Sequence, residues 1–207
     1  MSIPKIIVIA GPTASGKTAL GIELARRLNG EIVSADSMQI YKGMDIGTAK
    51  ATAEERATVV HHMLDIVSPA DNYSVARYTE DADRCCREIL SRDKLPIVVG
   101  GTGLYIDSLI YCRTFAASEE NRELREQLIH EYEIKGGEEM LRTLATFDPE
   151  RAARLHPSDM RRIVRSIEIY YLSGKTITEH DHMTQTLPPS YDAARIHLNF
   201  SDRALLY

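Results

Sequence analysis

Residues 11–18, GPTASGKT, carry the glycines and side chains that a phosphate-binding loop needs. Gly11 and Gly16 permit backbone conformations that turn successive N–H groups into one concavity, where they bind anionic oxygens. Lys17 adds a positive charge, and Thr18 adds a hydroxyl suited to Mg²⁺. The loop therefore predicts a di- or triphosphate ligand, with Thr18 as the metal ligand. The predicted phosphate-binding residues are Gly11, Pro12, Thr13, Ala14, Ser15, Gly16, Lys17 and Thr18.

Loops of this kind are typical of nucleotide-binding proteins, many of which bind ATP, but none of these contacts reads adenine. Proteins that hydrolyse ATP also use an acid at the end of a core strand. The apolar run 95–99 ends instead in Gly100, Gly101 and Thr102, where backbone and hydroxyl can approach a ligand closely. The loop alone thus leaves open which phosphate compound it binds.

A second group of reactive side chains follows the apolar run 31–35. Asp36, Ser37, Met38 and Gln39 bring a carboxylate, a hydroxyl and an amide into one short segment. The Asp36 carboxylate can act as a general base toward an amine or a hydroxyl. An amide such as that of Gln39 can bind the edge of an adenine through two hydrogen bonds. The alternative is that Asp36 only caps the turn that follows it.

These groups need a scaffold that brings three loops together, and the hydrophobic pattern predicts one. Apolar runs at 5–10, 31–35 and 95–99 predict buried strands, and residues 17–28 and 73–91 predict amphipathic helices. Strand, helix and strand in this order indicate a parallel sheet with right-handed connections. Because ligands bind beyond the carboxyl ends of such strands, the reactive groups are expected at one edge of the sheet.

From residue 118 the sequence changes to long polar helices. Residues 148–159 are predicted as a connector, 160–172 as a helix, the stretch up to 190 as irregular chain, and 194–200 as a strand returning to the sheet. Arg161, Arg162 and Arg165 lie on the predicted helix, and residues 151–175 carry six Lys and Arg against two Asp and Glu. This local charge suits a phosphate backbone, but ion pairs within the helix, such as Arg165 with Glu168, explain it equally well.

The composition limits the functional classes. The 207 residues carry a formal net charge of −5, so nucleic-acid binding has to depend on a local patch. No apolar stretch is long enough to cross a membrane. Cys85, Cys86 and Cys112 lack the spacing of disulfide or metal sites, which predicts a cytoplasmic protein. His61 and His62 diverge as chain neighbours, and we expect packing or substrate-loop contacts from them instead of metal binding.

In combination these motifs resemble the bacterial tRNA dimethylallyltransferases, also called tRNA isopentenyltransferases. The matching segments are, in chain order, GPTASGKT, DSMQIYKGMDIGTAK, HHMLDIVSP, YSVARY, PIVVGGTGLYI and DMRRIVRSIEIYYLSGK. The resemblance extends from about residue 5 to residue 207, and DSMQIYKGMDIGTAK with VGGTGLY is its most specific part. It implies a P-loop NTPase-like α/β fold, in which a parallel sheet is flanked by helices and carries a helical insertion.

The resemblance also implies an activity: transfer of a dimethylallyl group from dimethylallyl diphosphate to the N6 amine of the adenosine 3′-adjacent to the tRNA anticodon. Mg²⁺ is the implied cofactor, and Asp36 is the implied general base. Lys17, Thr102 and Arg125 are implied to join Asp36 in catalysis, and Arg122 is the alternative to Arg125. The implied tRNA contacts are Asp36, Ser37, Met38, Gln39, Arg161, Arg162, Ile163, Val164 and Arg165.

We expect an α/β core at residues 1–113, a helical tRNA-binding insertion at 114–190, and a returning strand with the start of a further core segment at 191–207. Members of this family usually continue with more helices, so we expect a truncated chain, and a monomer. Which tRNAs are modified, and whether this form is active, are left open. Three alternatives also remain open: an isopentenyltransferase acting on free AMP, ADP or ATP, a small-molecule kinase, and a tRNA-binding fragment without catalysis.

Overall fold

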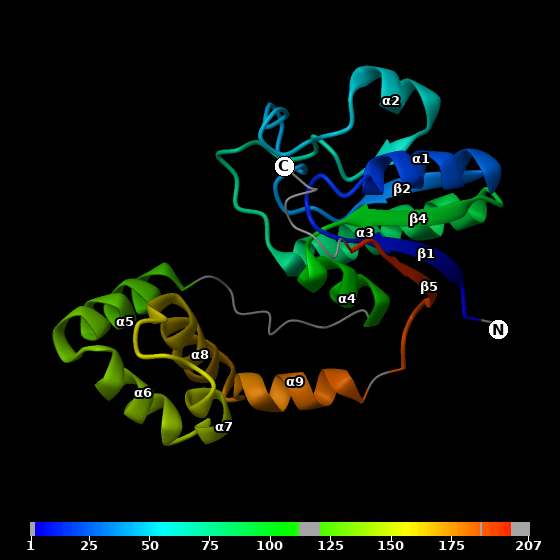
Figure 1. Cartoon of the computed structure of the whole chain (residues 1–207). Coiled ribbons are helices and arrows are strands. Elements are labelled where there is room, and N and C mark those ends of the chain that lie inside the picture. Colours follow the sequence, from blue (N-terminus) through cyan, green and yellow to red (C-terminus); the bar gives the residue numbers. More distant parts are fainter. Residues whose placement is uncertain (1–2, 112–120, 187, 200–207) are drawn as a thin grey trace. The chain divides into compact units, whose positions relative to one another are not determined.

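The computed structural model describes residues 3–111, 121–186 and 188–199, and the chain divides into two compact units (Figure 1). The sheet unit comprises Met1–Arg113 and Pro188–Tyr207, and the helical unit comprises Thr114–Leu187. The second boundary thus follows residue 187, where the sequence suggests 190. Cys112 and residues 200–207 of the predicted returning segment lie outside the described residues.

The sheet unit is built on parallel strands, as the sequence predicts. Within the described residues the sheet has five strands in the order β3-β2-β4-β1-β5, and all neighbours are parallel. The bounds are Lys5–Ala10 for β1, Gly30–Ser34 for β2, His61–His62 for β3, Leu95–Gly100 for β4 and Asp192–His197 for β5. In register, Val8 of β1 lies opposite Val98 of β4, and Ile9 lies opposite Ile196 of β5. The carboxyl ends of β1, β2 and β4 therefore share one edge.

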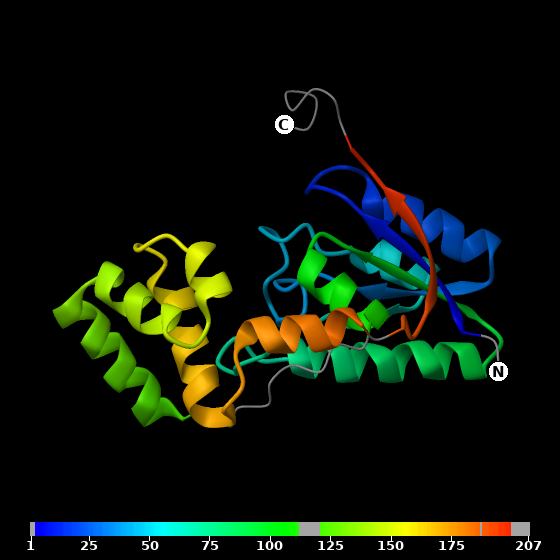
Figure 2. The ribbon, with the colours of Figure 1, turned by 90° about the horizontal axis from the view of Figure 1, so that it is seen from below.

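Helices cover both faces of this sheet (Figures 1 and 2). The bounds are Lys17–Arg27 for α1, Ala53–Thr58 for α2, Val75–Ser91 for α3 and Gly103–Tyr111 for α4. Ile9 of β1 packs with Ala25 of α1, whereas the neighbouring Val8 packs with Tyr78 of α3 and Leu109 of α4. Successive side chains of a strand point to opposite faces, so one short apolar run supplies both cores.

Helix α3 begins with a side-chain cap. Ser74 is the N-cap, and its hydroxyl accepts a hydrogen bond from the amide of Arg77 at 3.2 Å. Tyr78 and Cys86 are fully buried in the core, and the half-buried Cys85 packs against it. Adjacent helix positions differ by about 100°, so these two neighbouring cysteines differ in burial.

Tyr78 also connects this core to the sheet edge where the reactive groups gather. Its ring stacks on Tyr105 of α4, with ring centroids 3.9 Å apart and planes 16° from parallel. Its hydroxyl donates to the carbonyl of Ser34 at 3.1 Å. The end of β2, just before Asp36, is thus fixed by two packed aromatic rings and a buried hydrogen bond.

The two histidines of β3 make separate contacts. His61 Nδ1 lies 2.8 Å from the carbonyl oxygen of Val59, and His62 Nε2 lies 2.7 Å from a carboxylate oxygen of Glu31. Side chains of neighbouring strand residues point to opposite faces, which explains the divergence. Each histidine ring therefore has its own partner within the sheet unit.

Glu31, near the start of β2, is the centre of a buried charge cluster. Its side chain is 4% exposed and accepts hydrogen bonds from Lys94 Nζ at 2.8 Å and Arg92 Nη2 at 2.7 Å, beside the contact with His62. Burial raises the pKa of Glu31, but the hydrogen bonds from Lys94 and His62 and the charges of Arg92 and Lys94 outweigh it. The net result is a pKa lowered to about 2.

The free energy of unfolding should therefore fall in acid. A carboxyl with a depressed pKa in the folded state stabilises fully above its unfolded value of 4.5, and that contribution is lost as pH falls toward about 2. We expect the loss to amount to about 2–3 kcal/mol. Urea unfolding at pH 7, 4 and 2.5 measures it, and Glu31→Gln should lack this part of the acid dependence. The same dependence in both proteins would contradict the assignment.

The helical unit has its own core. Its helices are α5 Arg122–Lys135, α6 Gly137–Ala145, α7 Pro149–Ala153, α8 Met160–Ser173 and α9 Ile177–Gln185. The apolar faces of α5, α6 and α8 meet in a cluster of buried residues: Leu128, Met140, Leu144, Ile163, Val164 and Ile167. The predicted helix 160–172 is confirmed as α8, with one further residue.

Two segments predicted as irregular contain helices. Helix α7 lies within the supposed connector, where Asp148 caps it by accepting the amide of Arg151 at 3.1 Å. Helix α9 lies within the stretch before residue 190. Thr176 and Glu179 form a reciprocal capping box at its start, with hydrogen bonds of 2.7 and 3.1 Å. The spacing Thr-x-x-Glu is a helix-start signal, so α9 could have been predicted from it.

Candidate active site

The loop between β1 and α1 has the conformation that the sequence predicts. Gly16 lies in the left-handed region at φ 81° and directly precedes Lys17, the first residue of α1. Glycine is favoured there because a β-carbon is strained at such angles. Ala14, which has a β-carbon, is also left-handed at φ 63°, so the loop holds some backbone strain. The amino end of α1 adds its positive dipole to the same loop.

A cavity of about 260 Å³ lies against this loop. The loop residues from Thr13 to Thr18 line it, and Asp36, Gln39 and Val99 line it from the ends of β2 and β4. The structure thus brings the predicted phosphate ligands and the predicted general base to one cavity. We call it the phosphate cavity.

The oxygen-bearing side chains of the phosphate cavity suit a Mg²⁺ ion. Thr18 contributes a hydroxyl and Asp36 a carboxylate, and Glu55 of α2 contributes a second carboxylate that the sequence reasoning missed. Mg²⁺ prefers oxygen ligands and typically takes one or two carboxylates together with phosphates. The missed signal was the capping box of Thr52 and Glu55, which starts α2 beside the cavity.

Two polar groups of the loop are placed for phosphate oxygens. Lys17 Nζ donates to the carbonyl of Pro12 within the loop. Burial lowers the pKa of Lys17, and the charge of Asp36 acts in the opposite direction. The Ser15 hydroxyl is buried and has no hydrogen-bond partner among the described residues. Because an unpaired buried hydroxyl is costly, a bound phosphate oxygen is a fitting partner for it.

The Asp36 carboxylate caps the turn that follows it and also lines the phosphate cavity. Its Oδ1 accepts hydrogen bonds from the amides of Met38 at 2.9 Å and Gln39 at 3.3 Å, which is the capping role that the sequence left open. Within the part of the chain that the structure describes, Oδ2 has no hydrogen bond. Capping and general-base catalysis are therefore compatible, because they use different oxygens of one carboxylate.

Thr102 holds the same turn from β4. Its hydroxyl accepts the amide hydrogen of Ser37 at 3.1 Å, and its own amide donates to the carbonyl of Ala35 at 3.2 Å. The approach requires Gly100, since a β-carbon there would overlap the Ala35 carbonyl. Thr102 therefore positions the segment that follows β2, in addition to any substrate contact of its own.

The Gln39 side chain is engaged within the protein. Its Nε2 donates to the carbonyls of Thr48 at 2.9 Å and Ala49 at 3.3 Å, and its Oε1 accepts from the Ser34 hydroxyl at 3.2 Å. These bonds fasten residues 42–50, which we call the 42–50 loop, to the end of β2. Contact of Gln39 with an RNA base stays a prediction, and donation from its amide nitrogen to a base would require the bonds to Thr48 and Ala49 to open.

Lys50 fastens the far end of the 42–50 loop. Its side chain is 1% exposed, and its Nζ donates to the Tyr41 carbonyl at 2.8 Å, Asp45 at 2.8 Å and Asp65 at 2.6 Å. Burial lowers the pKa of Lys50, but the two carboxylates outweigh that effect and raise it. All three donors of the ammonium group are used, so the loop is held in one shape.

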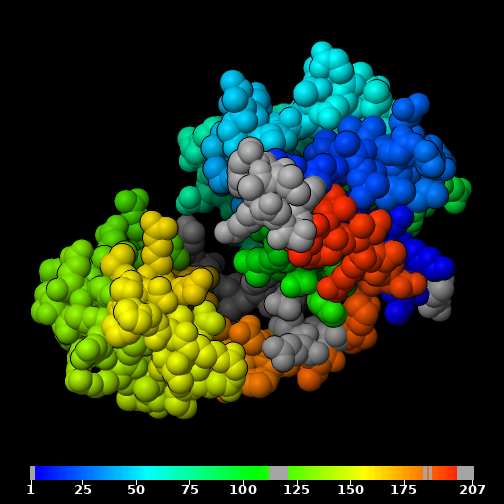
Figure 3. All heavy atoms as spheres, in the orientation of Figure 1, coloured from blue at the N-terminus to red at the C-terminus, as the bar shows by residue number. Residues whose placement is uncertain are grey.

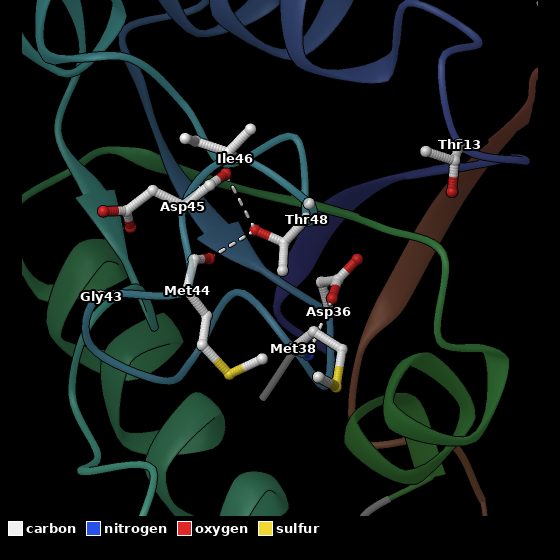
Figure 4. Close-up of a pocket in the computed structure, with 9 residues that line it drawn as sticks. Thr13, Asp36, Met38, Gly43, Met44, Asp45, Ile46 and Thr48 are labelled. Atoms are coloured by element: carbon white, nitrogen blue, oxygen red, sulfur yellow. Dashed lines mark hydrogen bonds between the residues drawn. The ribbon is translucent and has the colours of Figure 1, made fainter.

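A second cavity, of about 540 Å³, adjoins the first (Figure 4). The two cavities share Thr13, Asp36 and Thr48 as lining residues. Met38 and Met44 also line the second one, and in Figure 4 their methyl ends point toward each other. Asp36 therefore lies where a cavity lined by the phosphate loop meets a more apolar cavity.

In the helical unit, predicted basic residues surround a buried carboxylate. Arg125 of α5 binds Glu168 of α8 through two hydrogen bonds, Nε to Oε1 at 3.1 Å and Nη2 to Oε2 at 3.0 Å. Arg165 donates to the same Oε2 at 2.7 Å, and the Glu168 side chain is 0% exposed. Burial raises the pKa of Glu168, but the hydrogen bonds from Arg125 and Arg165 outweigh it and lower the pKa.

This ion-pair cluster borders a cavity of about 390 Å³. Arg125, Arg161 and Arg165 line it together with Ile129 and Met160. The predicted ion pair of Arg165 with Glu168 is thus present, but it leaves both paired arginines more than a third exposed. The exposed face of these arginines can attract an anion while the carboxylate holds them in place.

Two residues of the predicted tRNA-contacting segment are buried. Ile163 is 0% and Val164 4% exposed, and both pack in the core of the helical unit, where Val164 also lines the arginine-bordered cavity. Contact of either residue with tRNA stays a prediction. The side chains of Arg161 and Arg162 are exposed. Because α8 has the period of a helix, a five-residue segment cannot present every side chain to one ligand.

Replacing Arg125 by lysine should weaken the α5–α8 contact by about 1–2 kcal/mol, because one ammonium cannot reproduce the two-point contact with Glu168. Arg122 provides the matched control, since its ion pair among the described residues is an exposed one, with Glu126 at 3.0 Å. Arg122→Lys should change stability by less than about 0.5 kcal/mol. Amide hydrogen exchange in α5 and α8 measures both, and equal protection in the two variants would contradict the prediction.

No helix among the described residues is long and apolar enough to cross a membrane. The family model described as IPP transferase matches residues 39–207, and that described as isopentenyl transferase matches residues 4–66. The tRNA dimethylallyltransferases of Caldanaerobacter subterraneus subsp. tengcongensis and Acetivibrio thermocellus are each 48% identical over 98% of this chain. The chain spans 65% and 64% of their lengths, respectively.

Solved structures are similar as well. The tRNA isopentenylpyrophosphate transferase of Staphylococcus epidermidis is 42% identical, with a TM-score of 0.60 over 98% of this chain and 66% of that one. A eukaryotic dimethylallyltransferase acting on tRNA is 34% identical, with a TM-score of 0.82 over 98% of this chain and 50% of that one. The parallel sheet flanked by helices is thus shared with solved isopentenyltransferases.

Proposed function

Because the chain belongs to the IPP transferase family, we propose that it transfers a dimethylallyl group from dimethylallyl diphosphate to tRNA. The acceptor is the N6 amine of the adenosine 3′-adjacent to the anticodon. The observation that carries the proposal is the phosphate cavity, where Lys17, Thr18 and Asp36 meet. We further propose that Mg²⁺ is the cofactor and that the protein acts as a cytoplasmic monomer.

The phosphate loop binds the diphosphate of the donor. Its amides, the amino end of α1 and Lys17 stabilise the negative charge that grows on the diphosphate as it departs. The unpartnered Ser15 hydroxyl donates to one of its oxygens. Mg²⁺, when bound by Thr18 with Asp36 or Glu55, supplies further charge neutralisation.

Asp36 accepts the proton of the acceptor. The bond between C1 of the dimethylallyl group and the diphosphate oxygen breaks, C1 bonds to N6, and N6 transfers a proton to Asp36 Oδ2. The products are an N6-dimethylallyl adenosine in the tRNA and free diphosphate. Thr102 holds the turn that carries Asp36, so it contributes to the alignment of base and nucleophile.

The helical unit favours an RNA acceptor over free AMP. An otherwise acidic protein keeps Arg125, Arg161 and Arg165 around one cavity there, and phosphate groups of RNA are natural ligands for such arginines. A base in a single-stranded loop can leave its stack to reach an active site, as base-modifying enzymes require. A free nucleotide has no need of a separate unit with an arginine-lined cavity.

The proposal is tested by incubating the chain with labelled dimethylallyl diphosphate, Mg²⁺ and unmodified tRNA. We expect label in the tRNA, released diphosphate, and little competition from AMP. Preferred labelling of AMP would instead indicate the free-nucleotide enzyme, and γ-phosphate transfer from ATP would indicate a kinase. Binding of both substrates without transfer of label would contradict the catalytic proposal and favour the binding-only alternative.

A further inference from the structure

The second cavity carries apolar side chains that the phosphate chemistry does not use. Ile46 is 99% exposed, Met38 is 45% exposed, and Met44 is half-buried. All three line this cavity together with Asp36 (Figure 4). Figure 3 shows the light-blue 42–50 loop projecting from the surface of the sheet unit. One exposed apolar residue is ordinary, but two exposed and one half-buried apolar side chain around a reactive carboxylate form a patch that can bind an apolar ligand.

The exposure of these side chains is not that of a loose chain end. Gln39 and Lys50 bond the C-terminal part of the 42–50 loop, and the Lys42 amide at its start donates to the Val67 carbonyl at 2.9 Å. Inside the loop the Thr48 hydroxyl donates to the Met44 carbonyl at 2.6 Å. The apolar groups are therefore held in water by a well-bonded backbone. A hydrocarbon ligand that covers them recovers the free energy of removing that surface from water.

We propose that Met38, Met44 and Ile46 form the subsite for the hydrocarbon chain of an allylic diphosphate donor, with Met44 as a determinant of donor affinity. This inference rests on the proposed function. The two cavities share Thr13 and Asp36, so a donor with its phosphates on the loop and its reactive carbon at Asp36 extends its chain into the second cavity. Methionine suits this task because its flexible, polarizable side chain adapts to apolar ligands.

The polar groups of the second cavity do not suit the other reactant, an adenine base. Recognition of adenine typically uses an Asn or Gln amide, and Gln39 does not line this cavity and is already bonded. The Asp45 carboxylate is bound by Lys50, and the Thr48 hydroxyl donates to a backbone carbonyl. What remains for a ligand is mainly thioether and aliphatic surface.

The test compares two ligands, dimethylallyl diphosphate and inorganic diphosphate, by calorimetric titration in Mg²⁺. A methylene-sized contact contributes a factor of about four to affinity, so Met44→Ala should weaken dimethylallyl diphosphate binding roughly 4- to 15-fold. Binding of inorganic diphosphate should change less than about twofold, which also shows that the variant is folded. Met44→Leu keeps an apolar side chain of similar size and should retain the affinity.

The matched control is Met183→Ala, because Met183 is a 55% exposed methionine of the helical unit and should leave both affinities unchanged. An equal effect of Met44→Ala on both ligands, or no effect on either, would overturn the subsite. If Met44→Ala changed only the affinity for tRNA, the cavity would bind the acceptor base, and this result would also contradict the proposed subsite. Met44-dependent donor binding without any transfer to tRNA would support the subsite and contradict only the proposed function.

Discussion

Replacing Asp36 by asparagine is expected to slow dimethylallyl transfer by roughly 10²–10⁴-fold, the range that a general base contributes. An asparagine amide oxygen can still accept the hydrogen bonds from the amides of Met38 and Gln39, so the turn keeps its shape. What the variant loses is the basic oxygen that takes the N6 proton. Single-turnover transfer of label to tRNA measures the effect.

Diphosphate affinity separates this role from metal binding. Asp36→Asn should bind diphosphate in Mg²⁺ about as tightly as the wild type, because Lys17, Thr18 and the loop amides are intact. A parallel loss of diphosphate affinity would show that Asp36 serves the cation instead of the proton. Asp36→Ala additionally removes the turn cap, and we expect it to cost about 1 kcal/mol more in stability than the asparagine variant.

Gly100→Ala is expected to cost about 3 kcal/mol of unfolding free energy, the upper part of the usual range for overpacking. Its β-carbon would overlap the backbone carbonyl of Ala35, and a backbone group in a sheet cannot move aside as a flexible side chain can. The ends of β2 and β4 are bonded there, since the amide of Ala35 donates to the Val99 carbonyl at 2.8 Å. Separating them also moves Thr102 away from Ser37, so transfer should fall as well.

Gly101 is the matched control for Gly100. A β-carbon at Gly101 would have the Gly11 carbonyl as its nearest neighbour at 3.5 Å, an ordinary contact. Gly101→Ala should therefore change stability by less than about 0.5 kcal/mol. Urea unfolding of both variants measures the difference. If the two prove equally stable, the close approach of the strands is not what requires glycine at position 100.

The central strands of the fold were predictable because buried parallel strands are short, continuous apolar runs with little ambiguity. β1 and β4 match their predicted ranges to within a residue. The helices α2, α7 and α9 were not predicted, since they are short or polar and their apolar faces give a weak signal. Their caps give a stronger one, as the boxes at Thr52 and Thr176 show.

The candidate active site, too, could be predicted from the sequence only in part. That the phosphate loop, Asp36 and Thr102 meet follows from the parallel order of the strands alone. The roles of Gln39 and Lys50 do not, because they depend on which carbonyls and carboxylates a folded loop brings within about 3 Å. The burial of Ile163 has another cause: a motif is contiguous in sequence, whereas a helix divides it between core and surface.

The fastening of the 42–50 loop has a consequence for how this protein can be recombined with its relatives. The bonds described for it join Gln39 to Thr48 and Ala49, and Lys50 to partners between Tyr41 and Asp65. The Lys42 amide also donates to the Val67 carbonyl at 2.9 Å, so the bonds from the loop to these partners all lie within one contiguous stretch, residues 39–67. If this whole stretch were exchanged with that of a relative, the loop would keep these hydrogen-bond partners and its shape. If only residues 42–50 were exchanged, Lys50 and Thr48 would come from one protein and their partners Asp65 and Gln39 from the other. The loop would then depend on contacts between residues that did not occur together before.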